Sequence, residues 1–248
     1  MEDKDLENIF KNVDKLMSRG KYLDAIKMLN EISTKAKANS EEQADILSKM
    51  SQAYYGLEGV KTNNAVRFLI DSLNVRKGLD QPEILALEMM NLAYLQDESG
   101  DSKVAATTLK EALEVASDLG DKNLTLSLKC AMADMLSEDK EKEEDALAMY
   151  KSIMDEAEKI SDWENYFEAC VARIKIFRDR EDIYKANSEA EENLQKAEKI
   201  ISALKTKKDK EAFRDIVSYL YDVSIDLAME SEDIPRAMEL AKKFKGEE

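Results

Sequence analysis

The sequence predicts an all-α protein, built as a solenoid of about six antiparallel helix pairs. Three observations lead to this fold class. Apolar residues recur at helical spacing along almost the whole chain, and no long alternating pattern typical of strands competes with them. The 248 residues include only seven Gly and two Pro, so the turns that β-rich folds require are scarce. A short pattern centred on a small residue recurs at regular intervals, which is typical of stacked helical repeats.

Six helices are expected in the first half of the chain. Gly20 and the stretch "GLEG" at 56–59 mark breaks in the apolar pattern. Gly78 is expected to cap a helix in the left-handed conformation, which Gly adopts without a steric cost. Pro82 can start the next helix, because its missing N–H would be unpaired there anyway. The expected helices are 4–19, 22–38, 41–56, 62–78, 83–98 and 102–119.

Six more helices are expected in the second half. The apolar residues of 163–177 form a single helical stripe. Gly120 is expected as a second left-handed cap, and "RED" at 180–182 and "SED" at 231–233 mark further breaks. The expected helices are 122–138, 143–160, 162–179, 183–204, 209–230 and 233–245. Because no Pro-, Gly- or Ser-rich linker interrupts the series, we expect one continuous domain over 1–248.

The stretch "RGKYLDAIKML" at 19–29 recurs in outline through the chain. Its Ala25 aligns with a small residue that opens the second helix of each later pair, at successive intervals of 40, 40, 41, 40 and 51 residues. Those residues are Ala65, Ala105, Ala146, Ala186 and Ala237. A small residue lets two helices approach closely, and one pair alone cannot bury its apolar faces, so the pairs should stack. The expected repeats are 4–38, 41–78, 83–119, 122–160, 162–204 and 209–245.

The segment 89–121, "MMNLAYLQDESGDSKVAATTLKEALEVASDLGD", resembles a tetratricopeptide (TPR) repeat. Its "MNLAY" matches the family's Leu-Gly-x-x-Tyr block with Asn91 in place of Gly, and "GDSKVAATTLKEAL" matches the second block. "GKYLDAIKMLNEI" and "EDIPRAMELAKKF" match the second block as well, whereas "IYKANSEAEENL" matches it poorly. The ending "ALEVASDLGD" is similar to the longer TPR subclass of kinesin light chain and related adaptors. The resemblance implies a right-handed, TPR-like superhelix.

Composition excludes several classes of function. Asp and Glu outnumber Lys and Arg by 53 to 37, for a formal charge of −16, and such a surface repels nucleic acid and anionic lipid. The chain has no 18-residue apolar run, and its first residues, "MEDKDLEN", are charged and polar, unlike a signal peptide, so we expect no membrane span and a cytoplasmic location. It contains no His, the commonest general base and metal ligand. We therefore expect no enzyme, no cofactor and no metal.

Three further features each allow two interpretations. Cys130 and Cys170, at similar positions of neighbouring repeats, are interpreted as buried structural thiols, with a regulatory disulfide as the alternative. The acidic run "EDKEKEED" at 138–145 is interpreted as a solvated loop rather than a metal site. The basic run "KTKKDK" at 205–210 is a helix connection, interpreted as a solvated turn, with contact to an anionic partner as the alternative.

The resemblance implies a concave groove, lined by the first helix of each pair, that binds a peptide or helix segment of a partner. Transfer of that register places groove residues in repeats 2 to 5. They are Ser48, Gln52, Tyr55, Glu88, Leu92, Leu95, Lys129, Ala133, Leu136, Glu168, Ala172 and Lys175. Asn91 lies at a crossing position, where an amide either hydrogen-bonds a ligand backbone or satisfies a buried helix end.

The expected function is a non-catalytic protein-interaction module, either an adaptor, a scaffold or a regulator. Phe10 and Asp14 stand where TPR domains that bind acidic C-terminal tails have Lys and Asn. With the negative net charge, this favours a basic or apolar partner segment. A homo-oligomer paired through terminal repeats, by the apolar side of 233–245, is a variant of this function. The alternative class is a helical-repeat sensor of a small ligand, or an enzyme with an unrecognised pocket.

Overall fold

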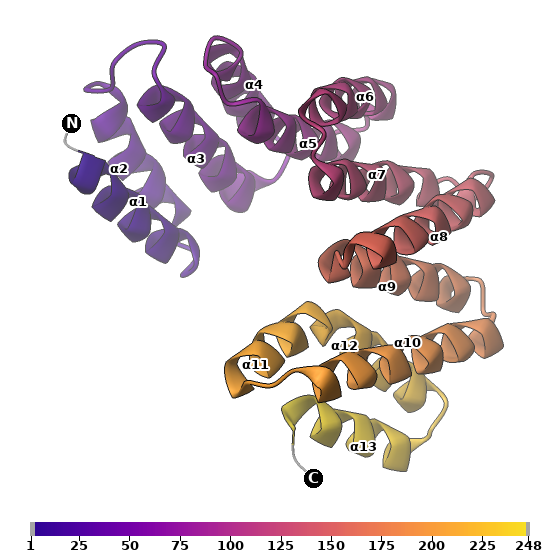
Figure 1. Ribbon diagram of the computed structural model, residues 1–248. Coiled ribbons are helices and arrows are strands. Elements are labelled where there is room, and N and C mark those ends of the chain that lie inside the picture. The colour runs from indigo at the N-terminus through magenta and orange to yellow at the C-terminus, as the bar shows by residue number, and fades with distance from the viewer. Residues whose placement is uncertain (1–2, 247–248) are drawn as a thin grey trace. The chain divides into compact units, whose positions relative to one another are not determined.

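The computed structural model describes residues 3–246, with side chains from residue 6 onward. All regular structure in this part of the chain is helical, with thirteen α-helices and no strand (Figure 1). The predicted all-α class is therefore confirmed. The chain divides into two compact units, 1–128 and 129–248, here called the N-terminal and C-terminal units. The boundary falls inside helix α7, and the single domain expected over 1–248 stays a prediction.

The N-terminal unit consists of successive helices that pack in chain order. Each of the helices α1 to α5 contacts the next one along the chain. Their bounds are α1 Asp3–Met17, α2 Tyr22–Ser33, α3 Glu41–Glu58, α4 Asn64–Arg76, α5 Pro82–Glu98 and α6 Ser102–Leu119, and α7 Lys122–Ser137 begins in this unit. Val13, Leu29 and Ile46 belong to one buried apolar cluster that joins α1, α2 and α3.

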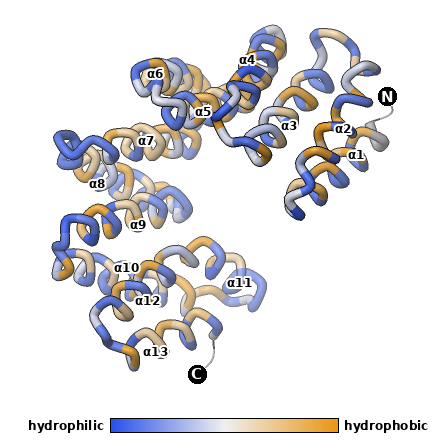
Figure 2. Tube along the Cα trace, turned by 180° about the vertical axis from the view of Figure 1, so that it is seen from behind, coloured by the Kyte–Doolittle hydropathy of each residue, from blue (hydrophilic) through white to orange (hydrophobic). Residues whose placement is uncertain are grey.

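The C-terminal unit continues the pattern around helix α9. Helix α9 contacts α8, α10 and α12, and α12 also packs on α10 and α13. The bounds are α8 Glu143–Ile160, α9 Trp163–Asp179, α10 Ile183–Ala203, α11 Lys207–Ile216, α12 Ser218–Glu230 and α13 Ile234–Lys245. Hydrophobic and hydrophilic residues alternate along these helices, as amphipathic helices in a stack require (Figure 2).

The recurring small residue lies where the sequence predicts it. Each of the six Ala residues is in the first turn of α2, α4, α6, α8, α10 or α13, the second helix of its pair. Ala25, Ala65, Ala105, Ala146 and Ala186 have no exposed surface, and Ala237 is 5% exposed. At these positions a larger side chain would hold the neighbouring helix away. The period is therefore a packing requirement of the helix pairs.

The expected helix 209–230 is wrong, because the structure contains two helices there. Helix α11 ends at Ile216, and α12 begins at Ser218. Val217 between them has φ −92° and ψ 6°, and its carbonyl accepts hydrogen bonds from the N–H groups of Leu220 and Tyr221. The break lets α11 direct its only buried residue, Phe213, onto α9 while α12 packs on α10. An apolar period does not register a single-residue break.

Other boundaries differ by a few residues. Helix α2 ends at Ser33 instead of 38, and α3 continues through Gly56 to Glu58. Gly78 has no positive φ and is not a left-handed cap, whereas Gly120 has φ 69° and ends α6 as expected. Pro82 begins α5 as expected.

Candidate partner-binding pocket

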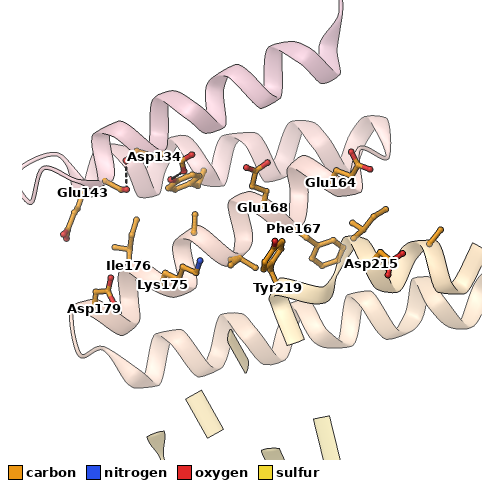
Figure 3. A pocket seen from close by; sticks show the side chains of 16 residues that line it. Asp134, Glu143, Glu164, Phe167, Glu168, Lys175, Ile176, Asp179, Asp215 and Tyr219 are labelled. Atoms are coloured by element: carbon orange, nitrogen blue, oxygen red, sulfur yellow. Dashed lines mark hydrogen bonds between the residues drawn. The ribbon is translucent and has the colours of Figure 1, made fainter. Parts of the chain in front are cut away.

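A pocket of about 920 Å³ opens in the C-terminal unit, and helix α9 forms one wall of it (Figure 3). Helix α9 supplies half of the lining, because residues at i, i+3, i+4 and i+7 spacing share one helix face. These residues are Glu164, Phe167, Glu168, Val171, Ala172, Lys175, Ile176 and Asp179. The other walls come from α7 (Asp134, Ser137), α8 (Glu143, Tyr150), α11 (Ala212, Asp215, Ile216) and α12 (Tyr219).

Helix α9 is held in place by polar contacts at both sides. At its start, the Asp162 carboxylate accepts a hydrogen bond from the Asn165 N–H at 3.2 Å, which caps the helix. Near its middle, Arg173 donates to the Leu147 carbonyl on α8 at 2.6 Å and pairs with Glu189 on α10 at 2.5 Å. These contacts fix the direction in which the pocket face of α9 points.

The pocket is strongly acidic. Six carboxylates and a single ammonium group, that of Lys175, line it. Glu143 is neutralised by Arg180 at 2.6 Å, and Asp134 accepts a hydrogen bond from the Tyr150 hydroxyl at 2.5 Å. Three others, Glu164, Glu168 and Asp215, have no cationic partner among residues 6–246. Figure 3 shows Glu168 in the middle of the site, with Glu164 and Asp215 toward one end.

Burial and the negative charge of this pocket shift the pKa of Glu168. Its side chain is accessible to water, but the walls of the pocket surround it. Partial desolvation, followed by the negative charges of Asp134, Asp162 and Glu164, raises the pKa of Glu168 above its ordinary value. A cation that entered the pocket would relieve this repulsion.

The floor of the pocket is apolar and aromatic. Phe167 is buried and packs edge-on against Phe213 of α11, with ring centroids 6.0 Å apart. Trp163, the only tryptophan of the chain, lies 6.5 Å from Phe213 in the same cluster. Tyr219 stands at the rim with 71% of its surface exposed (Figure 3). The site thus combines unpaired carboxylates with an apolar floor and an exposed aromatic ring.

Some of the groove residues expected from the sequence line this pocket, and others do not. Of the residues expected in repeat 5, Glu168, Ala172 and Lys175 all line the pocket. In repeat 4 the expected Ala133 is completely buried, and Lys129 pairs with Glu156 at 2.8 Å. Leu136 is half-buried and does not line the pocket either. The lining residues of α7 are Asp134 and Ser137, each one position further along, so the transferred register is displaced on this helix.

The expected set in repeat 3 is buried. Glu88, Leu92 and Leu95 are 5%, 6% and 9% exposed, which leaves them no surface to offer a partner. Here too the register is displaced by one residue, because α5 exposes Leu87, Asn91 and Tyr94 instead. The exposure of Asn91 argues against its role at a buried helix end.

The residues expected in repeat 2 are at least partly exposed. On α3, Gln52 and Tyr55 are exposed, and Ser48 is half-buried. The Tyr55 hydroxyl hydrogen-bonds the Glu98 carboxylate of α5, which raises the pKa of Tyr55. This bond joins the exposed sides of α3 and α5 within the N-terminal unit.

Four important pocket residues are absent from the sequence-based set: Asp134, Glu164, Asp215 and Tyr219. Glu164 stands four residues before Glu168, so the helical period could have found it. Asp215 and Tyr219 enter the pocket from either side of the break at Val217, which no sequence signal announces.

The two cysteines are free and buried, as the structural interpretation expects. The Cys130 Sγ lies 3.9 Å from the Asn165 Oδ1. Burial raises the pKa of both thiols, so neither is activated as a nucleophile. Within residues 6–246 no group of three or more Cys, Asp or Glu side chains is arranged to hold a metal ion. Across the same part of the chain, every helix is too short or too polar to cross a membrane.

Stacked antiparallel helix pairs with a small residue at each crossing define a TPR-like helical-repeat protein, and solved structures confirm this fold. A kinesin light chain from Podosopora anserina with nearly identical TPR-like repeats aligns with a TM-score of 0.60 at 13% identity, over 77% of this chain and 94% of that one. BtubC (BKLC) from P. vanneervenii aligns with a TM-score of 0.58 at 13% identity, over 95% and 93% of the two chains.

A third similar structure is a larger protein. The signal transduction ATPase with numerous domains (STAND) from Pyrococcus horikoshii, which has a tetratricopeptide repeat sensor, aligns with a TM-score of 0.64 at 16% identity. The alignment covers 97% of this chain but only 35% of that protein. No protein-family model matches the chain, and no curated protein matches it by sequence. At these identities the likeness establishes the fold.

Proposed function

We propose that the protein is a non-catalytic interaction module, an adaptor, scaffold or regulator, that binds a basic amphipathic segment of a partner protein in the pocket of the C-terminal unit. One observation carries this proposal. Glu164, Glu168 and Asp215 are carboxylates without cations, and they stand around an apolar floor. A segment with Lys or Arg on one side and apolar residues on the other complements both features.

The energetic contributions of the two features differ. The carboxylates favour encounter with basic partners and exclude acidic ones, an effect that salt weakens. Tyr219 offers a large, exposed and stiff aromatic surface of the kind that forms hot spots, where truncation to Ala costs about 2 kcal/mol or more. Affinity should therefore depend chiefly on Tyr219, and the choice of partner on the carboxylates.

The exposed face of α3 and α5 is a separate candidate contact region within the N-terminal unit. It comprises Gln52, Tyr55, Leu87 and Asn91. Its mixture of aromatic, apolar and amide side chains resembles the composition of protein interfaces.

The test is a titration of the full chain with a fluorescein-labelled, helix-forming peptide of Lys and Leu, followed by anisotropy and by Trp163 emission. Trp163 belongs to the aromatic cluster beneath the pocket, so its emission reports occupancy of this site. The matched peptide has Glu in place of every Lys. We expect saturable binding of the basic peptide with a change in Trp163 emission, and no change in Trp163 emission when the acidic peptide is added.

Variants locate the binding. Tyr219→Ala should weaken it about 30-fold, the equivalent of 2 kcal/mol. The double variant Glu164→Gln and Glu168→Gln should also weaken it, whereas Glu111→Gln, an exposed change on α6, should leave it intact. An equal change in Trp163 emission with the acidic peptide, or an unchanged affinity of Tyr219→Ala for the basic peptide, would overturn the proposal. Stoichiometric binding of a free polyamine without any peptide binding would instead support the small-ligand sensor.

A further inference from the structure

Cations without partners gather at one edge of the C-terminal unit. The end of α10, the helix α11 and the end of α13 meet there (Figures 1 and 2). Direct contact confirms the meeting, because a Cβ built on Gly246 would lie 2.8 Å from the Arg214 Nη2. We call this surface the basic edge. It consists of Lys205, Lys208, Lys210, Arg214, Lys242 and Lys245.

None of these six side chains forms an ion pair with a residue in 6–246. Acidic groups are nevertheless near: Asp209 stands between Lys208 and Lys210 in the sequence, and Glu198 and Glu239 pair with a different lysine. Lys243, beside Lys242, bridges Glu198 at 3.1 Å and Glu239 at 3.0 Å. In a chain with 53 acidic and 37 basic residues, six neighbouring cations without a counter-ion are unexpected on composition alone.

Helix dipoles explain only part of the basic edge. Lysines in the last turn of α13 are favourable, because the carboxyl end of a helix carries partial negative charge. Lys208 and Lys210 have the opposite position, in the first turns of α11, where the dipole is positive. Local stability therefore does not account for them. A sequence that breaks a local rule in this way often does so at a functional site.

The basic edge also has a recess. A cavity of about 510 Å³ is lined by Arg214, Lys242 and Tyr221, and also by the carboxylates Glu198 and Glu239, both of which are paired with Lys243. Tyr221 is 2% exposed, its ring packs against Phe244, and its hydroxyl has no hydrogen-bond partner within the described residues. The Arg214 guanidinium group, the Lys242 ammonium group and the Tyr221 hydroxyl group thus line one space, and each can donate to a carboxylate.

We propose that the basic edge binds an acidic segment of a protein partner, with one carboxylate side chain in this recess. The formal charge of −16 disfavours an extended polyanion such as nucleic acid or an anionic membrane, which would contact acidic surface beyond the edge. A short acidic peptide contacts only the edge, and salt screens the remaining charge over about 8 to 10 Å. The partner class is opposite in charge to that of the acidic pocket, so the two sites are separable.

The test measures anisotropy of a fluorescein-labelled peptide of alternating Glu and Ser, with alternating Gln and Ser as its control, on the full chain. The test variant combines Lys208→Gln, Lys210→Gln and Lys242→Gln. The matched variant combines Lys27→Gln, Lys35→Gln and Lys103→Gln, three exposed lysines without ion pairs elsewhere, and changes the net charge equally. Circular dichroism melts of both variants establish that they are folded. Arg214→Gln tests the recess separately.

We expect binding of the Glu peptide only, with about a tenfold loss of affinity in the test variant, since three surface contacts contribute modest energies that add. The matched variant should stay within about twofold of the natural chain. Affinity should fall between about 50 and 200 mM salt. Equal losses of affinity in both variants would show that the peptide responds only to the net charge of the chain, and this would overturn the proposal. So would no binding at low salt, or tighter binding of duplex DNA or of phosphatidylserine vesicles.

Discussion

The ring of Tyr22 occupies the space that a side chain at position 56 would need. A Cβ built on Gly56 would lie 2.2 Å from the Tyr22 Cε1, far inside van der Waals contact. Gly56 is inside helix α3, where Gly is otherwise unfavourable by about 1 kcal/mol relative to Ala. The Tyr22 contact between the first residue of α2 and the end of α3 explains why a glycine stands there.

The variant Gly56→Ala should lower the free energy of unfolding by about 1 kcal/mol. The loss of the Tyr22 contact, about 2 kcal/mol for a half-buried aromatic ring, exceeds the gain in helix propensity. In the background Tyr22→Ala, the same change should raise the free energy of unfolding by about 1 kcal/mol. The Tyr22 ring is absent there, so only the higher helix propensity of Ala relative to Gly has an effect. Urea denaturation of the four chains measures both signs. A destabilisation of equal size in both backgrounds would refute the account.

The sequence predicts the fold because packing repeats itself. Ala25 and its five equivalents are visible as a period, and all six are buried. The role of Gly56 is not visible in this way. In the sequence it reads as a break, since the aromatic ring that explains it comes from another helix 34 positions earlier (56 minus 22). Contacts of this kind depend on side-chain placement, which periodicity does not contain.

A buried ion pair joins α4 to α5 and α3. Arg76, 2% exposed, approaches Glu88 at 2.9 Å and Asp45 at 2.5 Å. Ser72 donates a hydrogen bond to the same Glu88 at 2.9 Å. This pairing explains why Glu88 is unavailable to a partner.

We expect Glu88→Ala to lower the free energy of unfolding by about 3 kcal/mol, because the buried guanidinium group loses one of its two charge partners and keeps only Asp45. The double variant Arg76→Met and Glu88→Leu should regain most of this loss, since apolar residues of similar volume replace the pair. Guanidinium denaturation followed by circular dichroism measures both. If the double variant is no more stable than Glu88→Ala alone, the unpaired charge is not the cause.

The candidate site could be predicted only in part, and the two helices show why. On α9 the transferred positions Glu168 and Lys175 face the pocket. On α5 the same transfer selects Glu88, which faces the core. A shift of one residue rotates a position by about 100° around a helix, which is enough to move a side chain from the groove face of the helix to its buried face. Contacts between side chains, such as the ion pair of Arg76 with Glu88, determine which face of the helix is turned to the core.

The Glu168 carboxylate should lower the stability of the folded chain and, at the same time, strengthen binding of the basic peptide. Because its pKa is raised in the folded chain, the folded state binds more protons than the unfolded state in the window between the two pKa values. Ionisation of Glu168 therefore lowers the free energy of unfolding. This destabilisation is absent below the pKa that Glu168 has in the unfolded chain, grows as the pH rises between the two pKa values, and is complete above the pKa of the folded chain. Glu168→Gln should therefore raise the melting temperature at about pH 7 and leave it unchanged near pH 4. The same variant should bind the basic peptide more weakly.

Thermal melts of Glu168→Gln at the two pH values, beside those of Glu111→Gln, check this prediction. Glu111 is exposed on α6 and serves as the control for removal of a negative charge. A stabilisation of equal size in both variants would attribute the effect to net charge and remove the pocket from the explanation.

Phe213 anchors helix α11 to the rest of the C-terminal unit. It is the only buried residue among the ten of α11, and its ring contacts Trp163 and Phe167. Phe213→Ala should lower the free energy of unfolding by about 3 kcal/mol and shift Trp163 emission to longer wavelength, because water then reaches the indole ring. Leu23→Ala, at a residue 67% exposed on α2, is the control and should change neither property. An unchanged emission spectrum of Phe213→Ala would show that α11 is held by other contacts.

The turn between α9 and α10 can be stabilised by a glycine. Glu181 has φ 59°, a left-handed conformation that costs a side-chain-bearing residue about 1 to 2 kcal/mol. Corresponding turns, before α2 and before α6, have Gly20 and Gly100 with φ 71° and 89°. Glu181→Gly should raise the free energy of unfolding by up to about 1 kcal/mol, once the greater chain entropy of Gly is subtracted. The matched change Glu192→Gly, exposed within helix α10, should lower it by about 1 kcal/mol. Urea denaturation distinguishes the opposite signs. If both variants lose stability, backbone strain at Glu181 is not what distinguishes this turn from its glycine-containing equivalents.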